Sequence, residues 1–295
     1  MLTDKKLPNN DNALRLLKIA SFVLLLFAST LIYGQSVHLV ILHTNDTHSQ
    51  VEPNDKNLGG YARRIGLIAK IRAEEENVLL LDAGDFSQGT PYYNFYKGRV
   101  EVEALNRMKY DAVTLGNHEF DNGMDTLLAV LQNNNVPILS ANYNFKNTPL
   151  DGRVEPFKVI QKGGLRIGIF GLGVNPKGLV FEPNYKGMIY SDPFTTADSI
   201  ANILKTKEKC DVIICLSHLG ANAGESGPND FEIARSSQYI DVILGGHSHD
   251  LITKTTEKNR RGKPVIIAQM GKSGLFLGRV DLTVEKKRKS WKKRK

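Results

Sequence analysis

The chain alternates between short, almost uninterrupted apolar runs and longer segments in which apolar residues recur with a helical period. The first pattern is typical of strands that are covered on both faces of a sheet, and the second is typical of amphipathic helices. The sequence therefore predicts strands at 37–43, 78–82, 111–115, 212–217 and 241–246. It predicts helices at about 60–76, 99–108, 123–134, 194–208 and 230–237.

Two pairs of apolar segments have the pattern of antiparallel strands. The segments at 157–161 and 165–172 flank a Lys-Gly-Gly turn at 162–164, which is typical of a hairpin. We expect the last two segments, 264–271 and 276–285, to pair with each other in the same way. Strands that alternate with helices, with antiparallel additions, indicate a layered α/β protein.

Side chains that can bind metals follow five of the predicted strands. They are Asp46 and His48, Asp85, Asn117 and His118, His218, and His247 and His249. Because ligands gather at the carboxyl ends of strands in an open α/β sheet, we expect these side chains to lie close together. Such a set suits two divalent cations that share a carboxylate, and centres of this kind carry out in-line displacement at phosphorus.

The spacing inside two of these motifs favours chelation. Asp46 and His48 are two positions apart, so at an extended strand end both side chains point to the same side. His247 and His249 repeat this spacing. Carboxylate combined with imidazole favours zinc, manganese, iron or similar ions over calcium, which prefers oxygen ligands alone.

A structural role for these histidines is the alternative, because a single histidine after a strand usually belongs to a loop or to the core. The chain has seven histidines, and five of them fall at predicted strand ends beside Asp, Asn or Gly. Coincidence does not explain that concentration. His38 and His43 lie outside the set, and we expect His38 to be exposed and His43 to be structural or to support a ligand.

The net charge of +8 comes from the end of the chain. Residues 286–295 hold eight Lys and Arg and no acid, which leaves 31 basic and 31 acidic residues in the remainder. A neutral body argues against a specific nucleic-acid binder. The basic tail is either a solvated chain end or a contact for an anionic surface or partner.

Residues 1–36 have the features of a secretory signal. Lys5, Lys6, Arg15 and Lys18 precede an apolar stretch at 19–33, which is shorter than the span of about 20 residues that crosses a membrane. We therefore expect an exported protein, periplasmic or at the cell surface, with an uncleaved N-terminal anchor as the alternative. The two cysteines give no further support, because on one strand they would lie about 16 Å apart, too far for a disulfide.

The motifs resemble those of the calcineurin-like metallophosphoesterases. They are DTH at 46–48, GDFSQG at 84–89, GNHEFD at 116–121, SH at 217–218 and GHSH at 246–249. LHTNDTH, GGYARR at 59–64 and LGNHEFDNG make the resemblance closest to the bacterial 5′-nucleotidase and UDP-sugar hydrolase family. The resemblance implies a four-layer αββα sandwich for a catalytic domain at 37–285.

The resemblance also implies a role for each motif residue. One cation would be held by Asp46, His48, Asp85 and His249. The second would be held by Asp85, Asn117, His218 and His247, with Asp85 bridging the two. His118, oriented by Asp121, would contact the phosphoryl oxygen or the leaving group, and Asn117 would also contact phosphate. A metal-bound hydroxide would attack phosphorus.

The implied activity is that of an exported metal-dependent phosphoesterase, similar to 5′-nucleotidases, that hydrolyses nucleotide phosphate esters. One alternative is a 2′,3′-cyclic nucleotide phosphodiesterase. Another is a broad-specificity phosphatase that needs a separate substrate-binding chain. An inactive, metal-bound binding subunit is an alternative of another class.

The sequence departs from the family pattern in two respects. Relatives carry a C-terminal domain that binds the base, whereas this sequence stops at Lys295, where that domain would begin. A separate chain that supplies the domain, a stand-alone enzyme and a truncated product are the alternatives. His249 stands where many relatives have Gln, so we expect an altered metal preference. Arg63 and Arg64 either line the substrate entrance or are solvated on their helix.

Overall fold

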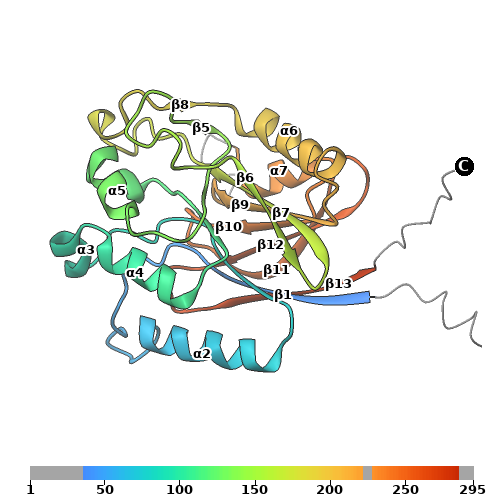
Figure 1. Ribbon diagram of the computed structural model, residues 1–295, viewed down its shortest axis with the longest axis horizontal. Coiled ribbons are helices and arrows are strands. Elements are labelled where there is room, and N and C mark those ends of the chain that lie inside the picture. The colour runs from blue at the N-terminus through green and yellow to red at the C-terminus, as the bar shows by residue number, and fades with distance from the viewer. Residues whose placement is uncertain (1–35, 222–227, 286–295) are drawn as a thin grey trace, which may run out of the picture. The chain divides into compact units, whose positions relative to one another are not determined.

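The computed structural model describes residues 36–221 and 228–285. Within them, Val37–Val284 form one compact unit built on two large β-sheets (Figure 1). The predicted signal or anchor at 1–36 lies outside the described residues, apart from Ser36, which begins the first strand. The basic tail at 286–295 lies outside them as well.

The first sheet carries three of the motif strands. Its order is β13-β1-β2-β3-β4, and β1, β2, β3 and β4 run parallel to one another. The strands are β1 (Ser36–Thr44), β2 (Val78–Asp82), β3 (Ala112–Thr114), β4 (Ile138–Leu139) and β13 (Gly278–Glu285). All residues of β2 and β3 are buried, as their continuous apolar sequences predict.

The second sheet carries the other two motif strands. Its order is β11-β12-β10-β9-β7-β6, with a parallel centre of β12, β10, β9 and β7 and an antiparallel strand at each edge. The strands are β6 (Phe157–Lys162), β7 (Leu165–Gly173), β9 (Val212–His218), β10 (Val242–Gly245), β11 (Leu251–Lys258) and β12 (Pro264–Met270). The predicted hairpin is confirmed, because β6 and β7 are antiparallel and Gly163 and Gly164 both have positive φ.

One prediction about strand pairing is wrong. The segments that form β12 and β13 do not pair, because the chain passes from the second sheet to the first between them. The motif strands are divided between the two sheets that the αββα sandwich requires. The antiparallel partner of β12 is instead β11, an exposed edge strand whose alternating polar sequence carries no apolar run.

Helices cover the outer face of each sheet (Figure 1). The first sheet packs against α2 (Tyr61–Glu74), α4 (Arg99–Met108) and α5 (Gly123–Leu131), and the second packs against α6 (Pro193–Thr206) and α7 (Asp230–Ser236). The remaining short elements are α3 (Pro91–Tyr96), η1 (His118–Phe120), η2 (Glu182–Tyr185), β5 (Tyr143–Asn144) and β8 (Ile189–Tyr190). No helix in the described part of the chain is long and apolar enough to cross a membrane.

Three apolar cores separate the four layers. On β1, Val40 belongs to the core under the helices, whereas Leu39 faces the second sheet. On β9, Ile214 belongs to the core between the sheets, whereas Ile213 packs with α6 and α7. Alternate residues of one strand point to opposite faces, so strands buried on both faces must be apolar throughout. The predicted αββα sandwich is confirmed by this arrangement.

Candidate metal centre

The segment after β1 turns sharply and does not continue as a strand. Asp46 and His48 both have a left-handed backbone, with φ of 47° and 45°. The extended geometry predicted for this pair is therefore wrong. The turn is held by the loop after β2, because Asp46 N donates to Gly84 O at 2.9 Å and His48 N donates to Asp85 O at 3.0 Å. Asp46 Oδ1 and His48 Nε2 still lie 3.9 Å apart.

Asp85 lies between elements of both sheets. It follows β2, has φ of 54°, and is 2% exposed. Its Oδ1 accepts a hydrogen bond from His118 N at 2.9 Å. Its Oδ2 lies 3.0 Å from Nε2 of His218, which ends β9. Asp85 therefore presents Oδ1 to the segment that holds His118 and Oδ2 to the end of β9.

The loop after β10 delivers the last two histidines. His247 and His249 have φ of 72° and 59°, again a left-handed backbone. The backbone N–H of His247 donates to both carboxylate oxygens of Asp46, at 3.1 and 3.0 Å. The Nε2 atom of His249 lies 3.4 Å from Asp46 Oδ1 and 3.0 Å from His48 Nε2. This loop thus joins the second sheet to the turn after β1.

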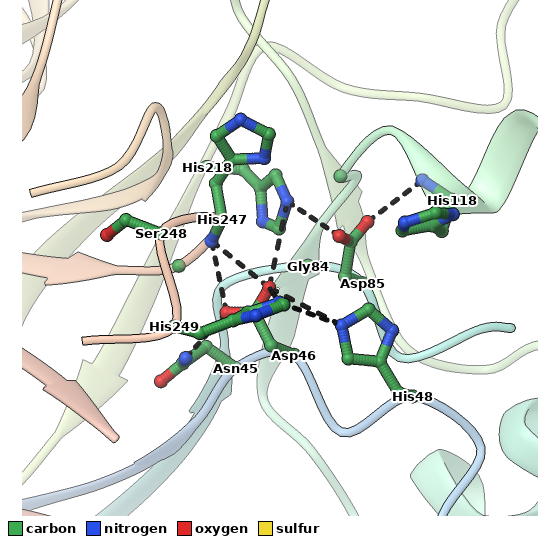
Figure 2. A network of polar contacts seen from close by, with 12 residues as sticks. Asn45, Asp46, His48, Gly84, Asp85, His118, His218, His247, Ser248 and His249 are labelled. Atoms are coloured by element: carbon green, nitrogen blue, oxygen red, sulfur yellow. Dashed lines mark hydrogen bonds and ion pairs between the residues drawn. The ribbon is translucent and has the colours of Figure 1, made fainter. Parts of the chain in front are cut away.

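The structure brings the predicted donor residues together at one point between the two sheets (Figure 2). Ligand atoms lie within 4.8 Å of one another in three groups, which are Asp46, His48 and His249; His48, Asp85 and His118; and Asp85, His218 and His247. Asn117 lies beside them, and its Oδ1 is buried without a hydrogen-bond partner among the described residues. Convergent carboxylates, imidazoles and an orphaned amide oxygen fit divalent cations of the zinc, manganese or iron type.

Asp85 and His218 influence each other's ionisation. Burial acts to lower the pKa of His218, but the adjacent Asp85 carboxylate outweighs it and raises this pKa to about 10. Burial acts to raise the pKa of Asp85, but His218 holds it well below its usual range. Nε2 of His218 faces Oδ2 of Asp85 at 3.0 Å. A divalent cation bound between these two atoms would compete with a proton for the same space.

His118 and Asp121 form a hydrogen-bonded pair at the edge of this cluster. Nδ1 of His118 lies 2.8 Å from Oδ2 of Asp121, and this bond is the main reason why the pKa of His118 is raised. Asn184 Nδ2 donates to the backbone carbonyl of Asp121 at 2.8 Å and so holds the acidic residue in place. The other ring nitrogen, Nε2, is left to act on a bound molecule.

The role of Glu119 was missed in the sequence analysis. This residue is 3% exposed, and its carboxylate accepts hydrogen bonds from three backbone N–H groups in the loops around Asp85 and Gly116. Burial, and then the neighbouring Asp85 carboxylate, raise the pKa of Glu119 to about 8. Its place next to His118 in the GNHE motif was the available signal.

The other polar residues considered in the sequence lie outside the cluster. His38 is exposed, as predicted, and bonds to Asp281. His43 is fully buried. Arg63 is exposed and bonds to Asn57, whereas Arg64 is buried against the loop at Gly274. Arg64 is therefore not solvated on its helix.

Comparison with known proteins identifies the family. The calcineurin-like phosphoesterase family matches residues 39–251, so the chain belongs to that family and is placed among the phosphoester hydrolases. The trifunctional nucleotide phosphoesterase YfkN of Bacillus subtilis is 32% identical over 281 aligned positions, which cover 84% of this chain and 18% of that protein. A 5′-nucleotidase of Vibrio cholerae is 34% identical, covering 82% of this chain and 48% of that protein.

The fold comparison agrees with the sequence comparison. The crystal structure of a 5′-nucleotidase precursor from Thermus thermophilus superimposes with a TM-score of 0.75 and 31% identity, covering 84% of this chain and 54% of that one. The chain thus spans about half the length of the 5′-nucleotidases it matches. The predicted membership of this family is confirmed.

Proposed function

We propose that the protein hydrolyses phosphate esters of nucleotides at a centre for two divalent cations. The observation that carries this proposal is the placement of Asp85 between two groups of donors. Asp46, His48 and His249 lie on one side of it, and His218 and His247 lie on the other. A carboxylate shared by two donor sets suits a centre for two cations, and such centres displace groups at phosphorus.

In this proposal the donors divide into two sets of four. The first set is Asp46, His48, Asp85 and His249, and the second is Asp85, Asn117, His218 and His247. Two divalent cations, when bound, neutralise phosphate oxygens and make water a nucleophile at neutral pH. The protein holds the donor side chains on loops that are fixed by backbone hydrogen bonds. Little rearrangement of these loops is therefore needed when cations bind.

His118 is the proposed catalytic residue outside the donor sets. Asp121 binds its Nδ1 atom, which stabilises the protonated ring and points Nε2 away from Asp121. A proton at Nε2 can be donated to the departing alkoxide or can stabilise a phosphoryl oxygen. Asn117, directly before it, is the second residue that we expect to contact phosphate. An inactive binding subunit would have no need of the His118–Asp121 pair.

The substrate class rests on the relatives. The names of the similar proteins specify 5′-nucleotidases and a trifunctional nucleotide phosphoesterase. The word trifunctional in the latter name is the reason for a second candidate activity at the same centre, and we propose nucleotide phosphodiesters for it.

The test is phosphate release by the purified full chain from 5′-AMP and, in parallel, ring opening of 2′,3′-cyclic AMP. Each reaction is measured with Mn²⁺ and with EDTA, and His118→Asn is the matched inactive variant. EDTA-sensitive turnover of 5′-AMP that His118→Asn abolishes supports the nucleotidase. Turnover of the cyclic substrate alone supports the diesterase. Two bound cations without turnover of either substrate would reject a stand-alone nucleotide phosphoesterase.

We also propose that the protein is exported, on the basis of the basic and apolar pattern at 1–36. Cell fractionation with N-terminal sequencing of the recovered protein tests this. Recovery outside the cytoplasm, with a new N-terminus near residue 35, supports a cleaved signal, whereas an intact N-terminus in the membrane fraction supports an anchor. Recovery of the full chain from the cytoplasm would reject export.

A further inference from the structure

Within the described residues, the Glu119 carboxylate accepts its hydrogen bonds from two loops that carry metal donors. Its Oε2 atom accepts from Asp85 N at 3.0 Å and from Gly116 N at 2.6 Å. Its Oε1 atom accepts from Ser87 N at 3.0 Å. The first loop presents Asp85, and the second leads directly into Asn117. A single buried carboxylate thus holds both loops by their backbones.

The first loop also accepts a hydrogen bond from the segment that carries Glu119. The backbone N–H of His118 donates to Asp85 Oδ1 at 2.9 Å. The loops approach so closely that a Cβ atom at Gly116 would lie 2.1 Å from the same oxygen. Asp85 and Glu119 therefore form a reciprocal clamp, in which each carboxylate accepts N–H groups from the segment that carries the other.

The alternative is that the hydrogen bonds to Glu119 serve only to offset the desolvation of its own carboxylate. That role does not account for which N–H groups bind it. A buried carboxylate needs hydrogen bonds to offset its desolvation, and many sources of N–H groups would serve. Here every donor belongs to 85–87 or 116, which lie on the segments that follow β2 and β3. The distance between those segments sets the distance between Asp85 and Asn117.

We propose that Glu119 is a positioning residue that fixes Asp85 relative to Asn117 and thereby forms the second of the two cation sites. This inference rests on the proposed two-cation centre. The cation held by Asp85, Asn117, His218 and His247 depends on both clamped loops. The other cation also has Asp46, His48 and His249, which Glu119 does not contact.

The variant that tests the proposal is Glu119→Gln. It keeps the size of the side chain but turns one acceptor oxygen into an NH₂ group that faces backbone N–H donors. The matched control is Asp111→Asn, which alters a carboxylate that accepts Leu80 N at 2.8 Å directly before β3, at the end away from Asn117. Full-length wild type and variants are stripped with chelator, checked by thermal unfolding, and titrated with Mn²⁺ by calorimetry.

We expect the wild type and Asp111→Asn to bind two Mn²⁺ ions with the same affinities. Glu119→Gln should bind one ion nearly as well as the wild type and the second about tenfold to a hundredfold more weakly, the usual cost of losing a group that orients ligands. If Glu119→Gln does not fold, Glu119→Asp replaces it and the same criterion applies. That variant keeps the carboxyl group but is one methylene too short to reach both loops.

Equal affinities for both ions in a folded Glu119 variant would overturn the proposal, as would equal weakening of both. A wild type that binds fewer than two ions would overturn this inference and the proposed centre together. A wild type that binds two ions but hydrolyses neither nucleotide would reject the proposed function alone. In that case a difference between the affinities of Glu119→Gln for its two ions would still establish the positioning role.

Discussion

His48 and His249 face each other across the two sheets, with their Nε2 atoms 3.0 Å apart although 201 positions separate them in sequence. His48 follows β1 of the first sheet, and His249 follows β10 of the second. Two imidazole nitrogens aimed at one point are poised to share a cation. Neither sheet alone can form this donor set, so binding of a cation there would depend on the packing of the two sheets.

Replacing His249 by Gln should change the preference between metal ions more than the number of ions bound. An amide oxygen is a harder donor than an imidazole nitrogen, so we expect affinity for Zn²⁺ to fall more than affinity for Mn²⁺. Competition titrations of the stripped protein with the two ions measure the ratio. His38→Gln changes an exposed histidine that bonds Asp281 and should leave the ratio unchanged. An unaltered ratio in His249→Gln would show that His249 is not a ligand.

Asp85→Asn should remove both cations and all measurable turnover. The carboxylate lies between the two donor groups and also accepts the backbone N–H of His118. Metal content after dialysis, measured by mass spectrometry, tests this result. Asp211→Asn provides a control, because Asp211 accepts Arg166 N at 2.8 Å away from the cluster. Retention of one full equivalent of metal would contradict a shared role for Asp85.

His118→Asn should lower kcat by about a hundredfold to ten-thousandfold, the usual contribution of general acid catalysis. The loss should be larger for 5′-AMP than for p-nitrophenyl phosphate, because the aryl oxide leaves without protonation more readily than an alkoxide does. Metal content should stay at the wild-type value. Steady-state kinetics with both substrates give the comparison. Equal losses on the two substrates would assign His118 to phosphate binding and not to proton donation.

His43 should make the protein less stable in acid. Burial lowers its pKa from 6.5 to about 4, and neither ring nitrogen has a hydrogen-bond partner within the described part of the chain. Above pH 6.5 the ring is neutral in both states, and stability is unaffected. As the pH falls from 6.5 to 4, His43 becomes protonated in the unfolded chain but stays neutral in the folded protein. The free energy of unfolding should therefore fall by about 3 kcal/mol over this range.

Urea unfolding in EDTA at several pH values measures this effect without a contribution from metals. The substitution His43→Leu should flatten the pH dependence between pH 6.5 and 4, whatever it does to stability at neutral pH. His38→Gln should leave the dependence as it is. A His43→Leu curve parallel to that of the wild type would be inconsistent with a buried neutral imidazole.

Gly116→Ala should disrupt the metal centre without a change of charge. The added Cβ would lie 2.1 Å from Asp85 Oδ1 and 2.7 Å from His218 Cε1, so both donors would have to move. Gly66→Ala is the matched control, because a Cβ at that helical position meets no atom within 4 Å. It should raise stability by about 0.5 to 1 kcal/mol. Mn²⁺ titration and thermal unfolding of both variants distinguish the two effects.

Most secondary structure could be predicted because its pattern is local. The helix expected at 99–108 is Arg99–Met108, and the strand expected at 78–82 is Val78–Asp82. In both, one short stretch of sequence decides which side chains must be buried. The edge strand Leu251–Lys258 was missed because it is largely solvated, and its partner strand Pro264–Met270 was assigned to the wrong neighbour. Strand pairing depends on distant segments that periodicity does not describe.

The sequence by itself determined the layered α/β architecture and the choice of candidate metal donors, because strands buried on both faces are apolar and end in polar motifs. Tertiary structure alone decided how those residues meet. Asp46, Asp85 and His249 adopt a left-handed backbone that costs on the order of 1–3 kcal/mol per residue. Such conformations persist only where hydrogen bonds from other loops stabilise them, as Asp85 N does with Glu119. Those partners come from different strands and different sheets, so no local pattern could reveal them.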